Sequence, residues 1–247
     1  MAERRVIAIT GAGGALGAAI SHQLAGEPDT ALVLSDVNAA SLDATVAGLA
    51  DGHGPVETAL ADVSDPAQVE AVAERAVKAF GRIDVWISNA GVLAPNGRIH
   101  NLTTEDWQRA FDVNVLGAVN GIRAAVGVMR PQGSGSIVLT ASVAGLTAWS
   151  HAAPYCATKA AVIQLAKVAA VEYARDGIRV NCVCPGTFLS AIHEGLPTEA
   201  IDAIGAKHPL GLGSAADLVG AYSYLASDAS RWTTGSAMVV DGGYAAP

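Results

Sequence analysis

The chain of 247 residues is poor in basic, charged and aromatic residues, and these shortages exclude several classes of protein. Charged residues make up 15% of it and aromatic residues 5%, and 15 Lys and Arg stand against 23 Asp and Glu, giving a net charge of −8. The basic residues form no cluster, so we expect neither a nucleic acid nor an anionic membrane surface as a partner. No apolar run approaches the roughly 18 residues that a membrane span needs.

Cysteine is also scarce, with Cys156, Cys182 and Cys184 as its three occurrences. An odd number without metal-like spacing is typical of the reducing cytoplasm. We interpret Cys182 and Cys184, which alternate on one predicted strand, as small core residues. Residues 1–5 do not have the layout of a signal peptide. The sequence therefore predicts a cytoplasmic protein without a metal site.

Hydrophobic residues make up 51% of the chain and fall into alternating strand-like and helical segments. The strand-like runs are almost continuously apolar, which is typical of parallel strands covered on both faces. We predict an α/β fold: a doubly wound parallel sheet of about seven strands with helices on both faces, in a single domain over residues 1–247. The expected strands are 6–10, 31–35, 56–61, 83–88, 136–141, 178–183 and 237–240, and the expected helices include 16–25, 67–80 and 155–174.

A glycine-rich loop follows the first expected strand, in the run Thr10-Gly11-Ala12-Gly13-Gly14-Ala15-Leu16-Gly17. Where such a loop leaves a strand and opens a helix, backbone N–H groups can approach a dinucleotide pyrophosphate, and the helix N-terminus adds favourable partial charge. A glycine motif alone is often only a tight turn, but its position between a strand and a helix indicates a dinucleotide site.

Asp36 closes the second expected strand, about twenty positions after the loop. A carboxylate there can hydrogen-bond the adenosine ribose hydroxyls and repels a 2′-phosphate. No Lys or Arg lies between Gly11 and Val37 to neutralise such a phosphate. The sequence therefore predicts NAD rather than NADP, with a simple strand-end turn residue as the alternative reading of Asp36.

Tyr155 and Lys159 are four residues apart in a predicted helix and so share one of its faces. A free phenol titrates near 10, and a fixed positive neighbour lowers its pKa. The pair could therefore make a tyrosine that exchanges a proton at neutral pH. Taken alone, the spacing also fits an ordinary tyrosine and lysine on one helix face.

With these motifs, the chain resembles the short-chain dehydrogenase/reductase family, in its branch of about 250 residues, over essentially its whole length. The motifs occur in the family's order: the glycine loop, Asp36, Asp62-Val63, Asn89-Ala90-Gly91, Asn114, Ser142, Tyr155-x-x-x-Lys159, Pro185-Gly186 and Asp241-Gly242-Gly243.

The resemblance implies the roles of the site residues. The implied catalytic residues are Asn114, Ser142, Tyr155 and Lys159. The implied cofactor contacts are Gly11, Gly14, Ala15, Leu16, Gly17, Asp36, Asp62, Val63, Asn89, Ala90, Gly91, Tyr155, Lys159, Pro185, Gly186, Phe188 and Ser190.

Two positions depart from the family's pattern. Ala15 stands where the short branch usually has glycine, and the spacing of Gly11, Gly14 and Gly17 matches the longer epimerase-like branch. Ser190 stands where a threonine usually holds the nicotinamide carboxamide, and serine keeps the hydroxyl.

The expected activity is an NAD-dependent interconversion of a secondary alcohol and a ketone. Tyr155 would be the general acid/base, Lys159 would lower its pKa, and Ser142 would bind the substrate oxygen. By resemblance, Asn114 would support a water that bridges to Lys159. Two alternatives stay open: an NAD-binding regulatory protein without activity, and an epimerase or dehydratase that uses transient oxidation.

The substrate is less defined by the sequence. Residues 187–213 read as a long loop and a substrate lid. The candidate substrate contacts are Val143, Trp149, His151 and His193, within a mostly apolar lining that favours an uncharged cyclic or aromatic alcohol or ketone. By resemblance, we expect a homotetramer that pairs long helices and C-terminal strands.

Overall fold

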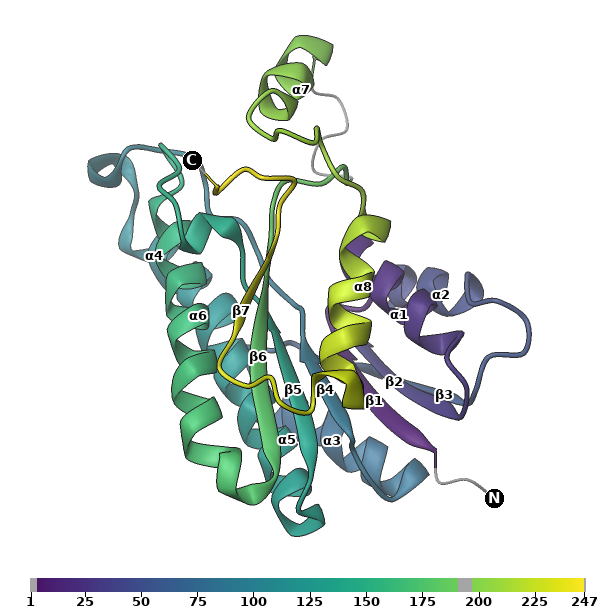
Figure 1. The fold of residues 1–247 in the computed structure, drawn as a ribbon. Coiled ribbons are helices and arrows are strands. Elements are labelled where there is room, and N and C mark those ends of the chain that lie inside the picture. The colour runs from purple at the N-terminus through teal and green to yellow at the C-terminus, as the bar shows by residue number, and fades with distance from the viewer. Residues whose placement is uncertain (1–3, 191–196, 247) are drawn as a thin grey trace.

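The computed structural model describes residues 4–190 and 197–246, and its centre is a parallel sheet of seven strands (Figure 1). The strand order is β3-β2-β1-β4-β5-β6-β7. In chain order the strands are β1 Arg5–Thr10, β2 Thr30–Asp36, β3 Val56–Leu60, β4 Val85–Ser88, β5 Gly135–Thr140, β6 Ile178–Pro185 and β7 Ala237–Val240. The predicted doubly wound sheet is confirmed, with strand ends displaced by up to two residues.

Helices cover both faces of the sheet (Figure 1). On one face lie α1 Ala15–Ala25, α2 Ala39–Ala47 and α8 Ala215–Ala226, and on the other lie α3 Pro66–Phe80, α4 Thr104–Phe111, α5 Gly117–Gln132 and α6 Ala153–Tyr173. Each layer encloses its own apolar core, so the strands between them are buried on both sides. This is why the strand sequences lack the alternation of polar and apolar residues seen in half-exposed sheets.

The strand order places one crevice in a defined position. Strand β1 pairs with β2 on one side and with β4 on the other, so the chain winds in opposite directions from β1. The loops that follow β1 and β4 therefore part at the carboxyl edge of the sheet, and ligands of doubly wound folds bind at such a point.

The segment expected to be a loop over 187–213 contains a helix, α7 Thr198–Gly205, which stands above the carboxyl edge of the sheet (Figure 1). The expectation of an irregular loop was therefore wrong for these residues. Pro197 was counted as a loop signal, but it lies at the N-cap of α7. Proline disrupts a helix interior and is tolerated at a helix start, where its missing N–H would have no intrahelical partner.

Candidate active site

The glycine loop after β1 is shaped by two close contacts. Gly11 has a φ of +65°, and a Cβ there would lie 2.6 Å from the Cα of Ala90. A Cβ on Gly17 would lie 2.0 Å from the carbonyl oxygen of Gly11. Any side chain at either position would push the loop away from β4 or from α1, so both glycines are required by packing.

The N-terminus of α1 can receive an anion. Gly14 is the N-cap residue and provides no side-chain hydrogen bond to the first helical N–H groups. A Cβ on Gly14 would meet only the Gly11 carbonyl, at 3.5 Å, so the loop surface is open there. Ala15 is exposed, and Leu16 is buried and anchors the helix. The exposed loop and uncapped N–H groups fit a dinucleotide pyrophosphate.

Asp36 lies beside this loop at the end of β2, as expected. One carboxylate oxygen accepts a hydrogen bond from the Gly13 N–H at 2.9 Å, and the other accepts one from the Asn38 N–H at 2.9 Å. The carboxylate is thus held against the glycine loop, where an adenosine ribose would lie in a fold of this type.

The other expected cofactor residues surround the same crevice. Asn89 donates from Nδ2 to the Gly11 carbonyl at 3.0 Å, and the Ala90 N–H donates to Thr10 Oγ1 at 3.3 Å. Val63 is buried against α5, where a Cβ on Gly117 would lie 2.7 Å from its Cγ2. The first two contacts tie the end of β4 to the end of β1, and the third packs the β3–α3 loop on α5. Asp62, which is exposed, accepts hydrogen bonds from Ser64.

The remaining expected cofactor residues follow β6. Pro185 is the last residue of that strand, and a Cβ on Gly186 would lie 2.7 Å from the Cα of Asp241, so this glycine permits the crossing with the C-terminal segment. Phe188 forms an isolated backbone bridge with Gly213, which brings the two ends of the expected lid segment, 187–213, together. Ser190 is half-buried at the limit of the described chain.

Tyr155 lies in the first turn of α6 and faces Ser142. Ser142 follows β5 and is buried, and its Oγ accepts a hydrogen bond from the Ala144 N–H at 3.1 Å. Burial raises the pKa of the Tyr155 phenol, and the hydrogen bond with Ser142 offsets part of that rise. The structure therefore brings Ser142 and Tyr155 together as expected.

Lys159 lies one turn further along α6 and is only 4% exposed. Its Nζ donates to the Thr140 carbonyl at 2.8 Å and lies 5.7 Å from the centre of the Tyr155 ring. Burial lowers the pKa of Lys159 to about 8. We expected the charge of Lys159 to lower the pKa of Tyr155, but in this structure burial of the phenol is the largest influence and raises that pKa.

Asn114 lies in a π-helical turn, Asp112–Leu116, between α4 and α5. Its Oδ1 accepts from the Val92 N–H at 2.8 Å, and its Nδ2 donates to the Val92 carbonyl at 2.9 Å and to Thr158 Oγ1 at 3.0 Å. A Cβ on Gly91 would lie 3.2 Å from Asn114 Oδ1 and 3.3 Å from Lys159 Nζ, so both polar groups border one space. Turns of this kind often mark functional positions.

The four expected substrate contacts are placed very differently. Trp149 is half-buried, and its ring centre lies 6.2 Å from that of Tyr155. Val143 is fully buried in the core, so it supports the site from behind and presents no surface to a ligand. His151 is exposed and its Nδ1 lies 2.8 Å from Ser150 Oγ. His193 lies outside the described residues.

Two positioning residues were not found from the sequence. The carbonyl of Thr140 accepts a hydrogen bond from Lys159, and the Oγ1 of Thr140 donates to Asn89 Oδ1 at 3.2 Å. Thr140 therefore joins the expected catalytic and cofactor residues. Thr158 supports Asn114. Thr140 ends β5, and its position at the carboxyl end of a central strand was the signal that could have identified it.

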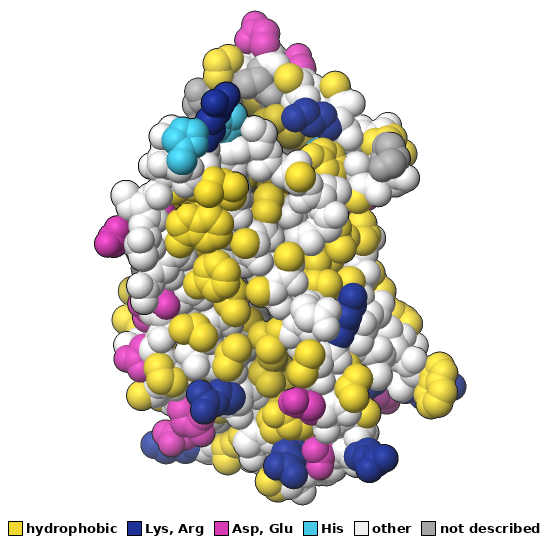
Figure 2. All heavy atoms as spheres, turned by 90° about the vertical axis from the view of Figure 1, so that its left-hand side faces the viewer, with side chains coloured by type: hydrophobic (Ala, Val, Ile, Leu, Met, Phe, Trp, Pro, Cys, Tyr) yellow, Lys and Arg dark blue, Asp and Glu magenta, His cyan; other side chains and the backbone are white. Residues whose placement is uncertain are grey.

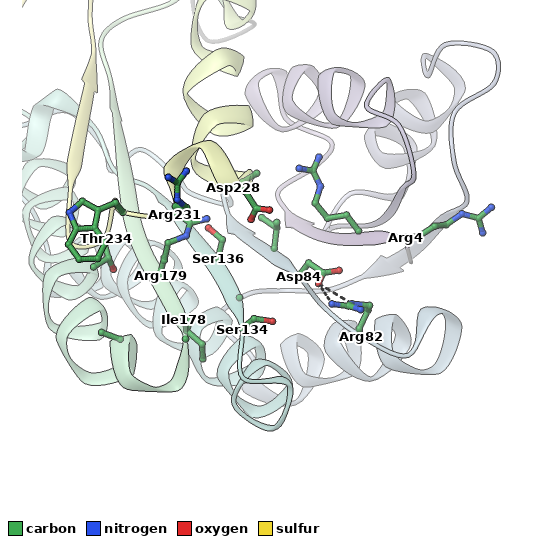
Figure 3. Close-up of a pocket in the computed structure, with 17 residues that line it drawn as sticks. Arg4, Arg82, Asp84, Ser134, Ser136, Ile178, Arg179, Asp228, Arg231 and Thr234 are labelled. Atoms are coloured by element: carbon green, nitrogen blue, oxygen red, sulfur yellow. Dashed lines mark hydrogen bonds and ion pairs between the residues drawn. The ribbon is translucent and has the colours of Figure 1, made fainter. Parts of the chain in front are cut away.

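A cavity of about 670 Å³ lies at the opposite, amino edge of the sheet and does not include any of these residues (Figure 3). Five arginines line it: Arg4, Arg5, Arg82, Arg179 and Arg231. Arg82 pairs with Asp84 at 2.7 Å, Arg5 pairs with Glu27, and Arg179 donates to backbone carbonyls. Most of the arginines that line the cavity therefore already pair with or donate to groups of the protein itself.

Within residues 4–190 and 197–246, no helix combines the length and the apolar character of a membrane span. In the same part of the chain, no group of three or more His, Cys, Asp or Glu side chains could hold a metal ion.

Known proteins are similar to this chain over almost its whole length. A family model described as enoyl-(acyl carrier protein) reductase matches residues 11–245. Cis-4-hydroxycyclohexanecarboxylate dehydrogenase of Sinomonas cyclohexanicum is 36% identical over 98% of this chain and 97% of its own length. Cyclohexanol dehydrogenase of Acinetobacter sp. (strain SE19) is 35% identical over 97% of this chain and 94% of its own length.

Solved structures agree. The crystal structure of levodione reductase superposes with a TM-score of 0.92 at 32% identity, covering 98% of both chains. A structure of ElxO with NADP bound superposes with a TM-score of 0.91 at 28% identity, covering 99% of this chain and 100% of that one. The fold and the site define an oxidoreductase that uses a nicotinamide dinucleotide. The chain belongs to the short-chain dehydrogenase/reductase family.

Proposed function

We propose that the protein interconverts a secondary alcohol and a ketone with NAD, and that Tyr155 is the general acid/base. The observation that carries this proposal is the convergence of Ser142, Tyr155 and Lys159 at the carboxyl edge of the sheet, beside the glycine loop. These are the groups that a proton transfer coupled to a hydride transfer requires.

When bound, the nicotinamide would supply or accept the hydride. Tyr155 takes the hydroxyl proton of an alcohol in oxidation and returns it to a ketone oxygen in reduction. Ser142 hydrogen-bonds the same oxygen and stabilises the charge that develops on it. Because burial raises the pKa of Tyr155, the resting phenol is protonated, and the positive charge of Lys159 favours the phenolate once it forms.

The side chain of Asn114 supports a route for that proton. Its Oδ1 and the Lys159 Nζ border the space next to Gly91, where a water could join them. The three hydrogen bonds of Asn114 hold the π-helical turn against Val92 and α6, so the amide keeps its orientation.

The preference for NAD is supported by Asp36. Both of its carboxylate oxygens are held by backbone N–H groups beside the loop, so the charge cannot swing away from a 2′-phosphate. No Lys or Arg occurs between Gly11 and Val37 to offset it. The neighbour with bound NADP shows that this fold also accepts the phosphorylated cofactor, and so the local charge must decide.

The substrate we propose is an uncharged cyclic or aromatic alcohol or ketone. The names of the two relatives above specify cyclohexane rings that carry a hydroxyl group. One of those substrates is a carboxylate, so the preference for a neutral ring rests on the lining of this site. There the half-buried Trp149 and the exposed Leu146 and Leu189 are apolar.

A screen of NADH absorbance over cyclic secondary alcohols tests the proposal. A matched pair, 4-hydroxycyclohexanecarboxylate and its methyl ester, isolates the effect of charge. We expect a kcat/KM at least about tenfold higher for the ester, since an unpaired carboxylate is costly to desolvate. A preference for the free acid would contradict the neutral-ring proposal.

The spacing of Gly11, Gly14 and Gly17 keeps an epimerase or dehydratase as a second candidate. An internal redox cycle shows no net formation or consumption of NADH, and so the same screen separates the two activities. Nucleotide binding without turnover on any compound would instead favour a regulatory NAD-binding protein.

We also propose that the protein assembles as a homotetramer. Figure 2 shows the face formed by the outer helices, where hydrophobic side chains gather between charged margins. Phe111, Leu116, Val168 and Val171 are large apolar residues exposed on α4, the π-helical turn and α6, with Val171 81% exposed. Such a surface favours burial against a second copy. A monomer by light scattering at micromolar concentration would contradict this.

A further inference from the structure

We propose that Tyr244, in the C-terminal tail, is a positioning residue that holds Trp149 and the base of the lid together, and thereby controls which substrates bind productively. The inference rests on the proposed function, since it assigns the substrate-selecting part of the same site. We call Trp149, Tyr244 and His208 the aromatic bridge.

The three rings of the aromatic bridge pack one after another in space, with Tyr244 between Trp149 and His208. The Tyr244 ring meets Trp149 edge-on, with centres 6.1 Å apart and planes at 77°. Its other side packs on His208, with centres 4.9 Å apart. Trp149 in turn lies 6.2 Å from the ring of Tyr155. Contacts of this kind each stabilise by about 1 kcal/mol, and they link the catalytic tyrosine to the lid.

The tail that carries Tyr244 is held in place by its own hydrogen bonds. Asp241 accepts from the Gly243 N–H and from the Ala245 N–H, both at 2.8 Å. The Leu210 N–H donates to the Gly242 carbonyl at 3.0 Å, which ties the tail to the end of the lid segment. The backbone that carries Tyr244 is therefore held beside its two neighbours.

His208 joins the two ends of the lid and is only 3% exposed. Its Nε2 accepts from the Thr187 N–H at 3.1 Å, so the hydrogen of the neutral ring is on Nδ1, which donates to the Ile204 carbonyl at 3.0 Å. Thr187 begins the lid segment and Ile204 belongs to α7. The orientation of His208 therefore sets how the lid meets the sheet.

Trp149 depends on packing for its position. Its indole N–H is buried and has no hydrogen-bond partner within the described chain. A buried donor without a partner is unfavourable by about 1–3 kcal/mol. The ring of Tyr244 packs edge-on against the indole and so opposes its rotation toward an acceptor, and without that ring we expect the wall beside Tyr155 to change shape.

Steady-state kinetics of Tyr244→Ala and Tyr244→Phe test the proposal, with Tyr224→Ala as a control at an exposed tyrosine on α8. In Tyr244→Ala we expect KM for the best cyclic substrate to rise about tenfold, with KM for NAD and kcat within about threefold of the parent. Tyr244→Phe keeps the ring and should match the parent. A Phe variant as impaired as the Ala variant would overturn the role of the ring.

Tryptic cleavage after Lys207 gives a second readout that needs no activity. Lys207 is exposed and precedes the buried His208, so its cleavage reports opening of the lid base. We expect cleavage about fivefold faster in Tyr244→Ala and unchanged in Tyr244→Phe.

Tyr244→Leu replaces the alanine variant in both measurements if the alanine variant does not fold. Unchanged cleavage, or unchanged KM, in the truncated variant overturns the proposal. If the parent turns over no compound, the proposed function fails and the cleavage rates alone decide.

Discussion

The two edges of the sheet each hold a partly or fully buried cation, and the two cations are bonded in opposite ways. At the carboxyl edge, Lys159 has one acceptor among the described residues, the Thr140 carbonyl. At the amino edge, Arg179 donates to the carbonyls of Leu225 at 3.0 Å, Ser227 at 3.3 Å and Thr233 at 3.5 Å. Burial lowers the pKa of both groups. A cation that keeps donors free of the described residues can bind a ligand, whereas a cation bonded to several carbonyls stabilises the fold.

The surroundings of the two edges extend this contrast. The carboxyl edge is formed by glycines, by hydroxyl side chains at strand ends such as Thr10 and Thr140, and by the uncapped start of α1. The amino edge has arginines paired with carboxylates, as Arg82 is with Asp84 (Figure 3). All strands of a parallel sheet end at the same edge, so groups for binding and catalysis can gather at the carboxyl edge. The charged side chains of the amino edge instead pair with other groups of the protein.

The largest effect should come from Tyr155→Phe at the carboxyl edge. Removing the hydroxyl leaves the ring packed against Trp149 but takes away the proton donor and acceptor. We expect kcat to fall by about 10³-fold with little change in NADH affinity, measured by steady-state kinetics and by fluorescence titration. Near-normal turnover would show that another group transfers the proton.

Replacing Lys159, the buried cation of that edge, should also change the stability of the fold. In Lys159→Met we expect the free energy of unfolding at pH 7 to rise by about 1–3 kcal/mol, because the parent keeps a charge in a site that lowers its pKa to about 8. Between that value and the unfolded pKa of about 10.4, the unfolded parent binds more protons, so its stability increases with pH.

The methionine variant has no titrating group at this position, so its advantage should shrink from pH 8 to pH 10. Urea unfolding of both proteins across this range measures the gap. A gap that stays constant with pH would mean that Lys159 is not destabilised by burial.

The sequence predicted the sheet and most of the site, because both depend on local patterns. Apolar runs mark strands buried on both faces, and β4 is buried along its whole length. The strand–loop–helix context located the glycine loop and Asp36. The spacing of Tyr155 and Lys159 predicted a shared helix face, which α6 provides.

What could not be predicted depends on distant contacts. Spacing alone cannot reveal how deeply Tyr155 is buried, and so it did not predict that burial raises the pKa of the phenol. Helix α7 was missed because the prolines and glycines around it mark its ends and were read as a loop. The packing of Tyr244 on His208 joins residues 36 positions apart, as their numbers show. No local sequence pattern predicts such a contact.

A smaller effect is expected at the cofactor side of the carboxyl edge. Asp36→Ala removes the carboxylate that we propose to face the ribose and leaves the N–H groups of Gly13 and Asn38 without its oxygens. We expect the ratio of kcat/KM for NAD over NADP to fall about tenfold, since the repulsion of the 2′-phosphate is lost. Asp43→Ala, at an exposed aspartate on α2, is the matched control. An unchanged ratio would leave Asp36 as a turn residue.

The smallest effect should arise at the amino edge and should be confined to stability. Arg179→Met removes the donors to three carbonyls, and its side chain is partly solvated, so we expect unfolding to become easier by about 1 kcal/mol. Arg231→Met, at an exposed arginine of the same cavity, should change the free energy of unfolding by less than about 0.5 kcal/mol. Both variants should keep the parent's kcat/KM. If Arg179→Met lowered kcat/KM without lowering stability, the amino edge would take part in catalysis. The proposal that the carboxyl edge is catalytic and the amino edge only structural would then be wrong.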